Sequence, residues 1–400
     1  MAQDIDSTKS ETTENELIKV FINCSSCDMP YLQQEIKWVN HVRDQDVADV
    51  QVFVAAQTTA SMGRIFELSF TGQTRFDGIN NTFSFTTESI TTADELRNKL
   101  KKNIELGLVP YIAHTGILDN MSLMVRDSGL QKKAVPKDDP WNKWIFDVNS
   151  QTNLNQEQSF SNFLFQLGLE ADRATEEWKF RSNSGINMNT RTIYTDTDTI
   201  VSINQRSWSN GTVVKSLGNH WSAGLAGSFY SNTFQNLKES FSGGPAIEYS
   251  FFPYSQVMKR EITLAYRLNF GMQNYFEETI FEKMADKISS HSLNLGVRYI
   301  QPWGTTYARV SGSHFLNNLE YRRLTVSNWT SVRIFKGLSM RLNAQFSLIR
   351  DQIFLPRREA TEAEIFLRQR SLATSYDLYL GGGLNYKFGS IYNNVVNTRL

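Results

Sequence analysis

Cys24 and Cys27 are the residues of this chain whose type and spacing most directly suggest chemistry. They are the 2 cysteines of the 400 residues, and their CSSC segment lies between a β-rich run over 17–23 and a predicted helix. A helix N-terminus stabilises a thiolate, and redox-active CxxC pairs occupy this position for that reason. In an oxidising compartment, two cysteines at this spacing also form a local structural disulfide.

Four interpretations of the pair are open, and a structural disulfide is the one we favour. Thiol–disulfide exchange has less support, because the strand and helix order after Cys27 does not continue as a thioredoxin fold. A metal site has less still, since no second CxxC and no paired histidines follow. Two free thiols are the remaining alternative. We therefore predict a disulfide or redox pair at Cys24 and Cys27, no metal site and no cofactor.

The second candidate set consists of charged residues in the segments after Trp141, where apolar and polar residues alternate. Successive side chains of a strand point to opposite faces, so each segment has one apolar and one polar face. Two uses of the polar face are open: ion pairs across a filled or loop-plugged interior, which we favour, or a pore whose basic excess favours anions. The predicted lumen-facing charges are Lys179, Arg181, Arg267, Arg298, Arg309, Arg333, Arg341, Lys387, Asp147, Glu170, Asp172, Glu248 and Asp377.

We predict no catalytic residue. A lipid-modifying barrel enzyme would need a serine hydrogen-bonded to a histidine on the outer barrel surface. The histidines of the alternating region are His220, His291 and His314, and serines directly adjoin the last two in the sequence. Neighbours on a strand point to opposite faces, so these adjacent pairs cannot bond side chain to side chain.

The alternating segments predict an antiparallel transmembrane β-barrel of about twelve strands. The clearest segment is LSMRLNAQFSL over 338–348, in which the even-numbered residues are apolar and the odd-numbered residues are polar. A tilted strand crosses a membrane with about 9–11 residues. Short turns flanked by aromatic residues, with longer connections between them, are also typical of outer-membrane barrels. A soluble β-sandwich is the alternative, but it has no reason to place aromatic residues at most turns.

Residues 17–130 predict a small α+β domain of the order β-α-β-β-β-α-β. We expect its strands near 17–23, 47–56, 64–72, 82–87 and 121–126, and its helices over 29–43 and 92–106. Gly107 is expected to end the second helix. The polar residues 1–16 are expected to form a disordered lead and 131–140 a linker, which leaves 141–400 for the barrel.

The composition is consistent with this division. Basic and acidic residues are balanced at 41 each, so nothing favours nucleic-acid binding. No apolar window of the roughly 18 residues needed for a membrane-spanning helix is present. The N-terminal stretch lacks the apolar core of a signal peptide. Since an outer-membrane protein must be exported, we expect the signal to have been removed from this numbering.

Two long stretches of the sequence resemble a family of uncharacterised outer-membrane β-barrel proteins of Bacteroidota and related Gram-negative bacteria. These stretches are FINCSSCDMPYLQQEIKWVNHVRDQDVADVQVFVAAQ and the ending GGGLNYKFGSIYNNVVNTRL. The resemblance covers nearly the whole chain and is most specific at the CxxCD, VNHVRD…ADV and YKFGSIYNN elements. It implies a barrel preceded by a small periplasmic domain, and it brings no activity and no catalytic residues.

Together these observations predict a non-enzymatic outer-membrane barrel with its N-terminal domain in the periplasm. We expect outer-membrane lipid around the barrel and a periplasmic or outer-membrane protein as partner, because a simple diffusion porin needs no such domain. The function would be docking of that partner or a part in envelope assembly. A passive pore for small anionic solutes is the alternative, and an outer-membrane lipid-modifying enzyme is a less supported one.

Overall fold

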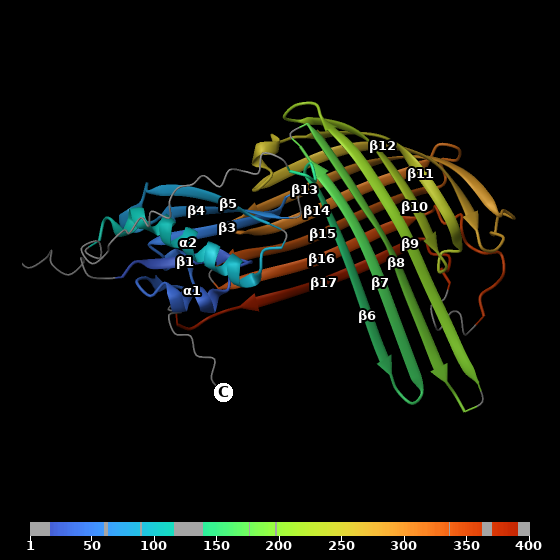
Figure 1. The fold of residues 1–400 in the computed structure, drawn as a ribbon, viewed down its shortest axis with the longest axis horizontal. Helices are drawn as coiled ribbons and strands as arrows, with labels where there is room; N and C mark the ends of the chain where they lie inside the picture. The colour runs from blue at the N-terminus through green and yellow to red at the C-terminus, as the bar shows by residue number, and fades with distance from the viewer. Residues whose placement is uncertain are drawn as a thin grey trace, which may run out of the picture.

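The computed structural model of this chain describes residues 17–59, 63–88, 90–115, 139–175, 177–196, 198–335, 337–361 and 370–390. They form a small α+β domain followed by a sheet of 12 strands, which confirms the predicted fold class. Figure 1 shows the small domain beside one end of the large sheet. The expected lead, the strand near 121–126 and most of the linker lie outside the described residues.

The small domain contains a 5-stranded sheet in the order β2-β1-β3-β4-β5. β1 runs parallel to β2 and β3, whereas β4 is antiparallel to β3 and β5. The strands are β1 (Lys19–Cys24), β2 (Asn40–His41), β3 (Val50–Thr58), β4 (Arg64–Gly72) and β5 (Asn80–Thr87). The helices are α1 (Met29–Glu35) and α2 (Ala93–Ile112), with the 3₁₀ turns η1 (Gln45–Val47) and η2 (Thr74–Phe76).

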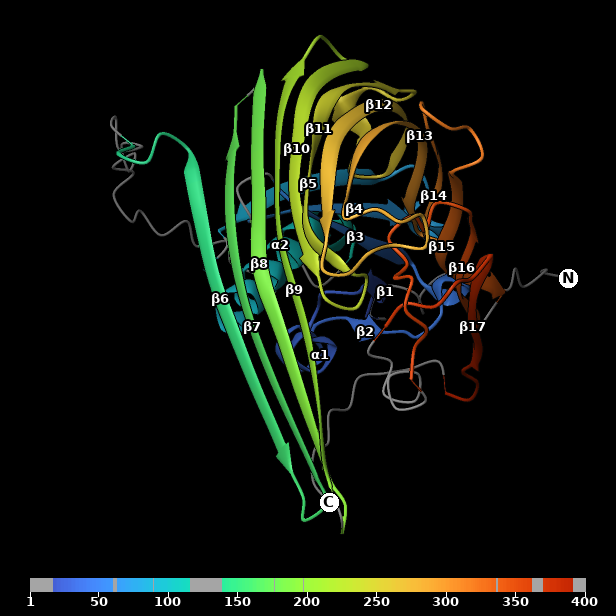
Figure 2. The ribbon, with the colours of Figure 1, turned by 90° about the vertical axis from the view of Figure 1, so that its right-hand side faces the viewer.

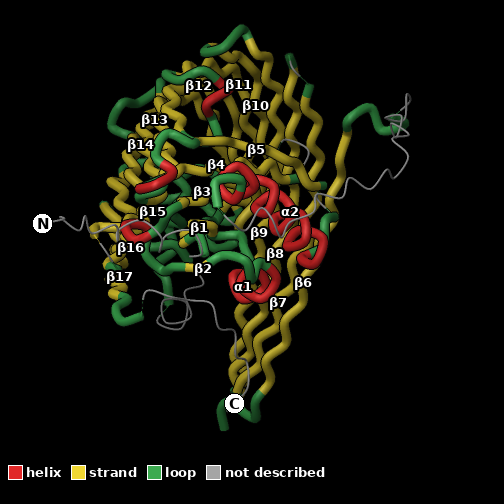
Figure 3. The backbone as a smooth tube through the Cα atoms, turned by 90° about the vertical axis from the view of Figure 1, so that its left-hand side faces the viewer, coloured by secondary structure: helices red, strands yellow, loops and turns green. Residues whose placement is uncertain are grey.

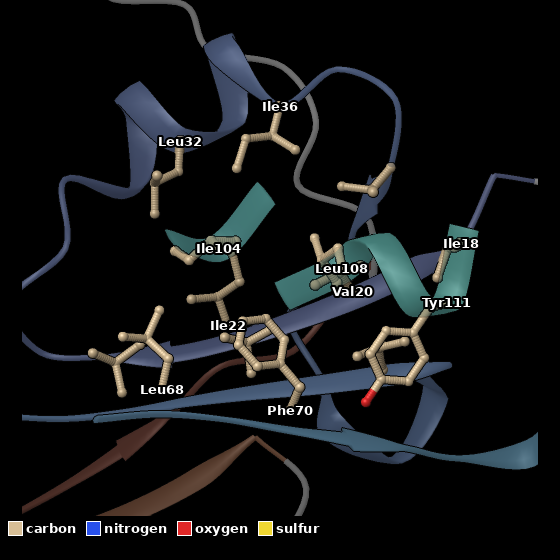
Figure 4. Packing of buried hydrophobic residues seen from close by; sticks show 14 of the residues in the cluster. Ile18, Val20, Ile22, Leu32, Ile36, Leu68, Phe70, Ile104, Leu108 and Tyr111 are labelled. Carbon is tan, nitrogen blue, oxygen red and sulfur yellow. The ribbon is translucent and has the colours of Figure 1, made fainter. Parts of the chain in front are cut away.

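The core of the small domain lies between the two helices and one face of its sheet (Figure 4). Complete burial of one such aliphatic side chain stabilises a fold by about 1.5–3 kcal/mol, so this cluster fixes the position of both helices. Figure 3 shows the helices on the side of the small domain turned away from the large sheet. The fully buried side chains include Ile18, Val20, Leu32, Ile36, Leu68, Phe70, Ile104, Leu108 and Tyr111.

The predicted helix over 29–43 is wrong in its second half. α1 ends at Glu35, and the chain then turns back as β2, where the Asn40 amide donates to the Ile18 carbonyl at 2.8 Å. Pairing with β1 is favoured over a longer helix because it also gives hydrogen bonds to the backbone groups at the free edge of β1. Val39 stays buried in the bend before β2, so a continued helix and the observed bend would bury the same apolar residue.

The second helix starts where the sequence predicts and ends later. Thr92 and Glu95 form a capping box at its N-terminus, but α2 continues through Gly107 to Ile112. The Phe70 ring fills the place of a side chain at 107, since a Cβ built there would lie 1.9 Å from Phe70 Cζ. Gly107 therefore allows close packing of helix on sheet instead of ending the helix.

The large sheet is an antiparallel meander in which each strand pairs only with its sequence neighbours. We call it the barrel sheet. Its first 6 strands are β6 (Trp144–Gln156), β7 (Phe160–Ala174), β8 (Trp178–Tyr194), β9 (Thr199–Ser216), β10 (Trp221–Asn232) and β11 (Leu237–Ser250). The others are β12 (Arg260–Tyr275), β13 (Ala285–Gln301), β14 (Gly304–Phe315), β15 (Arg322–Phe335), β16 (Leu338–Ile349) and β17 (Tyr376–Tyr386).

The two ends of the barrel sheet differ in their connections. The domain end, which faces the small domain, carries the connections 175–177, 217–220, 251–259, 302–303 and 336–337. The loop end carries 157–159, 195–198, 233–236, 276–284, 316–321 and 350–375. The expected alternation of short and long connections therefore holds only in the second half of the sheet, since the first connections at the loop end are as short as those opposite.

The barrel sheet curls, but its first and last strands are not joined in the described part of the chain. β6 pairs with β7 and β17 pairs with β16, and neither has a second neighbour there. Figure 2 shows β6 and β17 on opposite sides of the curled sheet. Among the described helices, none has the length and apolar character needed to cross a membrane.

Candidate functional site

Cross-strand register puts the predicted lumen-facing charges of the barrel strands on a single face. Asp147 is directly opposite Glu170, Asp172 opposite Arg181, and the same row-by-row relation connects the remaining strands. Directly paired residues share a face, so this face can be followed from β6 to β17. We call it the inner face, because the opposite face carries the exposed apolar side chains. Lys387 follows the last residue of β17.

Some of the inner charges are paired. Arg181 Nε lies 2.9 Å from Asp172 Oδ1, whose residue is 4% exposed. Arg298 Nη2 lies 3.0 Å from Glu261 Oε2 and donates to the Val257 carbonyl at the same distance. Buried charges need partners of this kind. Glu261 is absent from the predicted set because it is the second residue of its strand, where alternation gives little signal.

A polar chain extends this network along the inner face of β7–β9. Trp208 Nε1 donates to Asn183 Oδ1 at 2.7 Å, and Asn183 Nδ2 donates to Glu170 Oε1 at 2.8 Å. The predicted carboxylate at 170 therefore accepts from an amide instead of from a basic residue. Neutral residues of the inner face therefore donate some of the hydrogen bonds that the charge pattern alone would assign to arginine and lysine.

Other inner charges have no such partner. Within the described residues, the guanidinium groups of Arg267, Arg309 and Arg341 form no hydrogen bond and no salt bridge. Arg309 lines an inner cavity of about 600 Å³ together with Glu261 and Arg298. The remaining predicted charges Asp147, Lys179, Glu248 and Asp377 form no salt bridge with any described residue either.

The small domain contacts the domain end of the barrel sheet directly. Lys259 Nζ lies 2.6 Å from Glu67 Oε1, and Asn23 Nδ2 donates to the Pro302 carbonyl at 2.9 Å. The predicted inner charge Arg333 donates to the side chain of Gln45 in the small domain, and its guanidinium lies 4.8 Å from the Phe21 ring centre. Arg333 therefore holds the domain in place instead of facing an open interior.

Cys24 and Cys27 form a disulfide, with their Cα atoms 5.5 Å apart. Cys24 is the last residue of β1, and Asp28 caps α1 directly after Cys27. Cys24 also lines a cavity of about 870 Å³ between the small domain and the domain end, together with Arg341 and Lys387. Among the described residues no group of three or more His, Cys, Asp or Glu side chains is arranged to hold a metal ion.

The described parts of the connection 350–375 fold back over the loop end. Phe354 and Leu355 pack against Leu237 and Tyr275 of the far strands, and all 4 are less than 10% exposed. Asn236 Nδ2 donates to the Phe354 carbonyl at 3.1 Å. Sequence alone left open whether this connection covers the mouth, enters the interior or projects outward. Its described residues 350–361 and 370–375, which we call the cover, contact β11, β12 and the connection 276–284 at the loop end.

Further contacts fix this cover from both sides. Arg323 holds Asp351 with both carboxylate oxygens within 3.0 Å. Arg357 lies 3.1 Å from Glu282 on the connection 276–284, and Arg370 pairs with Glu277 there. A cavity of about 480 Å³ lies at the inner face and is lined by Asp351, Ile353 and Phe354 of the cover and by strand residues that include 7 serines. The segment 362–369, which favours helix by composition, lies outside the described residues.

The histidines do not form a serine-based catalytic arrangement in the described residues. His291 and His314 are direct cross-strand partners on the outer face, and His291 also meets the Tyr266 hydroxyl at 2.9 Å. The adjacent Ser292 and Ser313 pair with each other on the inner face, as strand geometry requires. His220 contacts the backbone carbonyl of Ser250.

Comparison with known proteins finds a distant structural likeness. No family model matches the sequence, and no curated protein matches it either. Among solved structures, the translocator domain of autotransporter NalP from Neisseria meningitidis is similar over 61% of this chain and 87% of that chain. The two are 10% identical, with a TM-score of 0.27. A likeness of this degree carries no inference about function.

Proposed function

We propose that this chain is a non-enzymatic outer-membrane β-barrel protein whose small domain lies in the periplasm and docks a protein partner. The exposed apolar outer face of the barrel sheet is the observation that carries the proposal. Leu225, Val148 and Leu384 on three separate strands are 64%, 71% and 70% exposed. Soluble proteins do not leave an apolar face of this extent in water, whereas a bilayer covers it.

Aromatic side chains mark the domain end of this outer face. Trp178 stacks with Phe180, Trp221 lies 4.8 Å from Tyr249 between ring centres, and Tyr386 stacks with Phe388. Trp and Tyr collect at the level of the lipid headgroups because their rings are apolar and their N–H or O–H groups are polar. The band therefore supports a membrane boundary at the domain end.

A membrane-spanning sheet must also close. Open strand edges leave backbone groups without hydrogen bonds in lipid, at a cost of several kcal/mol per group. β6 and β17 run antiparallel when the meander of 12 strands closes, so their free edges are suited to pair with each other. We therefore propose that the inserted protein joins β6 to β17, with both barrel termini and the small domain on the periplasmic side.

β5 is the part of the small domain best suited to bind a partner. It pairs with β4 along one edge and has no second neighbouring strand in the described residues. Its residues Thr82, Phe83 and Ser84 are exposed. An extended segment of a partner can add to such an edge through main-chain hydrogen bonds. The other face of the domain is occupied by the barrel contacts of Asn23, Gln45 and Glu67.

Photo-crosslinking tests the docking proposal. A photoreactive amino acid at Ser84 on the free edge is expected to capture a protein partner in intact cell envelopes. The same amino acid at Lys99, which is exposed on α2, is the matched control and should capture none. Equal labelling at both positions, or labelling at neither position in a protein shown to be folded, would contradict docking at β5.

A pore for small anions is the second candidate, because Arg267, Arg309 and Arg341 have no salt bridge within the described residues. The described residues 350–361 and 370–375 at one end and the small domain at the other end oppose free passage. Planar-bilayer recording separates the two functions. We expect no steady conductance from the wild type. A steady, anion-selective conductance that falls in Arg309→Gln would favour the pore.

A further inference from the structure

The outer face of the barrel sheet carries a row of basic side chains close to the loop end. His291 on β13 is directly opposite His314 on β14, and His314 is directly opposite Arg322 on β15. The row continues to Arg350, whose amide donates to the Arg322 carbonyl at 3.0 Å. Four successive strands or strand ends thus contribute one imidazole or guanidinium group each to one line.

The arginines of this row are available to a ligand. Within the described residues, neither the Arg322 nor the Arg350 guanidinium forms a hydrogen bond or salt bridge, and both residues are exposed. The nearby carboxylate of Asp351 is held by Arg323, which belongs to the inner face. The described contacts therefore give neither of these two guanidinium groups an anionic partner.

An apolar groove lies next to the basic row, toward the middle of the strands. It has a volume of about 960 Å³ and is lined by both rings of the histidine pair, both arginines and several apolar residues. Gly312 leaves the floor open, since the nearest side-chain atom to a Cβ built there is Leu324 Cδ1 at 4.0 Å. The apolar lining consists of Leu293, Leu324, Phe346, Leu348 and Tyr376.

We propose that this surface binds a membrane lipid with a phosphate headgroup. The phosphate would lie on Arg322 and Arg350, because guanidinium groups bind phosphate through paired N–H donors. The histidine pair beside the arginines is engaged within the protein. The two rings contact each other through Nε2, the Tyr266 hydroxyl meets His291 Nδ1 at 2.9 Å, and His314 Nδ1 meets the Phe315 carbonyl at 3.2 Å. The acyl chains would fill the groove over Gly312. The basic row lies close to the loop end, and the apolar groove lies closer to the middle of the strands. A lipid in the proposed membrane would place its headgroup and its acyl chains in the same order.

This inference rests on the membrane location proposed above, which must be tested first. Membrane flotation after urea extraction checks that the full chain is integral to the membrane. Failure there overturns the membrane proposal and the lipid site together. An integral protein without lipid selectivity overturns only the lipid site.

Native mass spectrometry of the detergent-solubilised full chain tests the site. Dioleoyl phosphatidic acid should be retained, whereas dioleoyl glycerol, with the same chains and no phosphate, should not. The double variant Arg322→Gln/Arg350→Gln should weaken retention of the first phosphatidic acid by about tenfold or more. Arg309→Gln, on the inner face, is the matched control and should bind like the wild type.

Two further measurements distinguish the contribution of the headgroup to binding from that of the groove. Inorganic phosphate should not compete at the concentration at which the lipid saturates the site, because it lacks chains for the groove. Gly312→Leu should lower lipid retention while both arginines remain. Equal retention of the two lipids, loss in Arg309→Gln equal to that in the double variant, or competition by phosphate would each overturn the proposal.

Discussion

Arg298 on β13 and Glu261 on β12 are direct cross-strand partners whose side chains form an ion pair of 3.0 Å on the inner face. The Arg298 side chain is 18% exposed and also donates to the Val257 carbonyl, which belongs to the connection at the domain end. This pair therefore links β12 and β13 to the connection 251–259, which faces the small domain.

Replacement of Glu261 by Gln should destabilise the barrel sheet. It leaves a mostly covered guanidinium without its carboxylate, and such a loss costs about 1–3 kcal/mol. Thermal unfolding in detergent, followed by the heat-dependent shift in gel mobility, measures the effect. Glu320→Gln, in the connection 316–321, removes the same charge without breaking a described ion pair and should leave the midpoint unchanged. Equal midpoints for the two variants would contradict the assigned role.

Closure of the barrel sheet predicts a cross-link between β6 and β17. Asn149→Cys, combined in turn with Tyr379→Cys, Gly381→Cys or Gly383→Cys, should form an intramolecular disulfide in at least one case. The bond requires Cα atoms closer than about 7 Å, which only paired edges reach. Asn149→Cys with Ser228→Cys is the control, since β10 lies within the sheet. Exclusively intermolecular cross-links would show instead that the two edges pair between chains.

Substitution of Gly107 by Ala should destabilise the small domain. In an ordinary helix this change stabilises by roughly 0.5–1 kcal/mol. Here the new methyl group enters the Phe70 ring, and overpacking costs about 1–3 kcal/mol. Hydrogen exchange of α2 and β4 in the full chain measures the change. Lys102→Ala on the exposed side should have little effect, and adding Phe70→Leu to the glycine variant should recover part of the loss.

Acidification should weaken the small domain through His41. Burial lowers the pKa of His41 from 6.5, although the 3.0 Å contact with the Ile36 carbonyl opposes this shift. The folded state therefore prefers neutral imidazole. Its contribution to stability is complete above pH 6.5 and is lost as the pH falls below that value, where the unfolded chain binds the proton first.

Hydrogen exchange of β1 and β2, corrected for intrinsic rates, measures this dependence between pH 7.5 and pH 5. His41→Asn should flatten it. His114→Asn, which changes an exposed histidine after α2, should leave it as in the wild type. If the pH dependence of exchange persists in His41→Asn, a group other than His41 causes it.

Alternation predicts which residues of a strand share a face, because strand geometry is local, and the cross-strand register puts the charged residues on one face. Arg298, Arg309 and Arg341 could be placed on one face from their spacing alone. Their partners could not, because pairing depends on register between strands that are far apart in the sequence. Glu261 and Gln45 illustrate this, since each binds an arginine that local sequence places without any partner.

The predicted C-terminal ends of the two helices were wrong for a similar reason. Gly107 is a helix terminator by local preference, but Phe70 from a separate strand turns it into a packing position. The edge at β2 shortens α1 because Ile18, more than twenty residues earlier, accepts a hydrogen bond from Asn40. The basic row of His291, His314, Arg322 and Arg350 was likewise missed. Its members come from three strands and from the residue after β16, and only the register brings them together.

The cover over the loop end has a consequence for the timing of assembly. Phe354 and Leu355 belong to the connection between the last two strands, while their partners Leu237 and Tyr275 belong to strands made much earlier. The Asn236 to Phe354 hydrogen bond joins residues 118 positions apart. These contacts can therefore form only after the hairpin of β16 and β17 has been made, and the earlier strands have to fold without them.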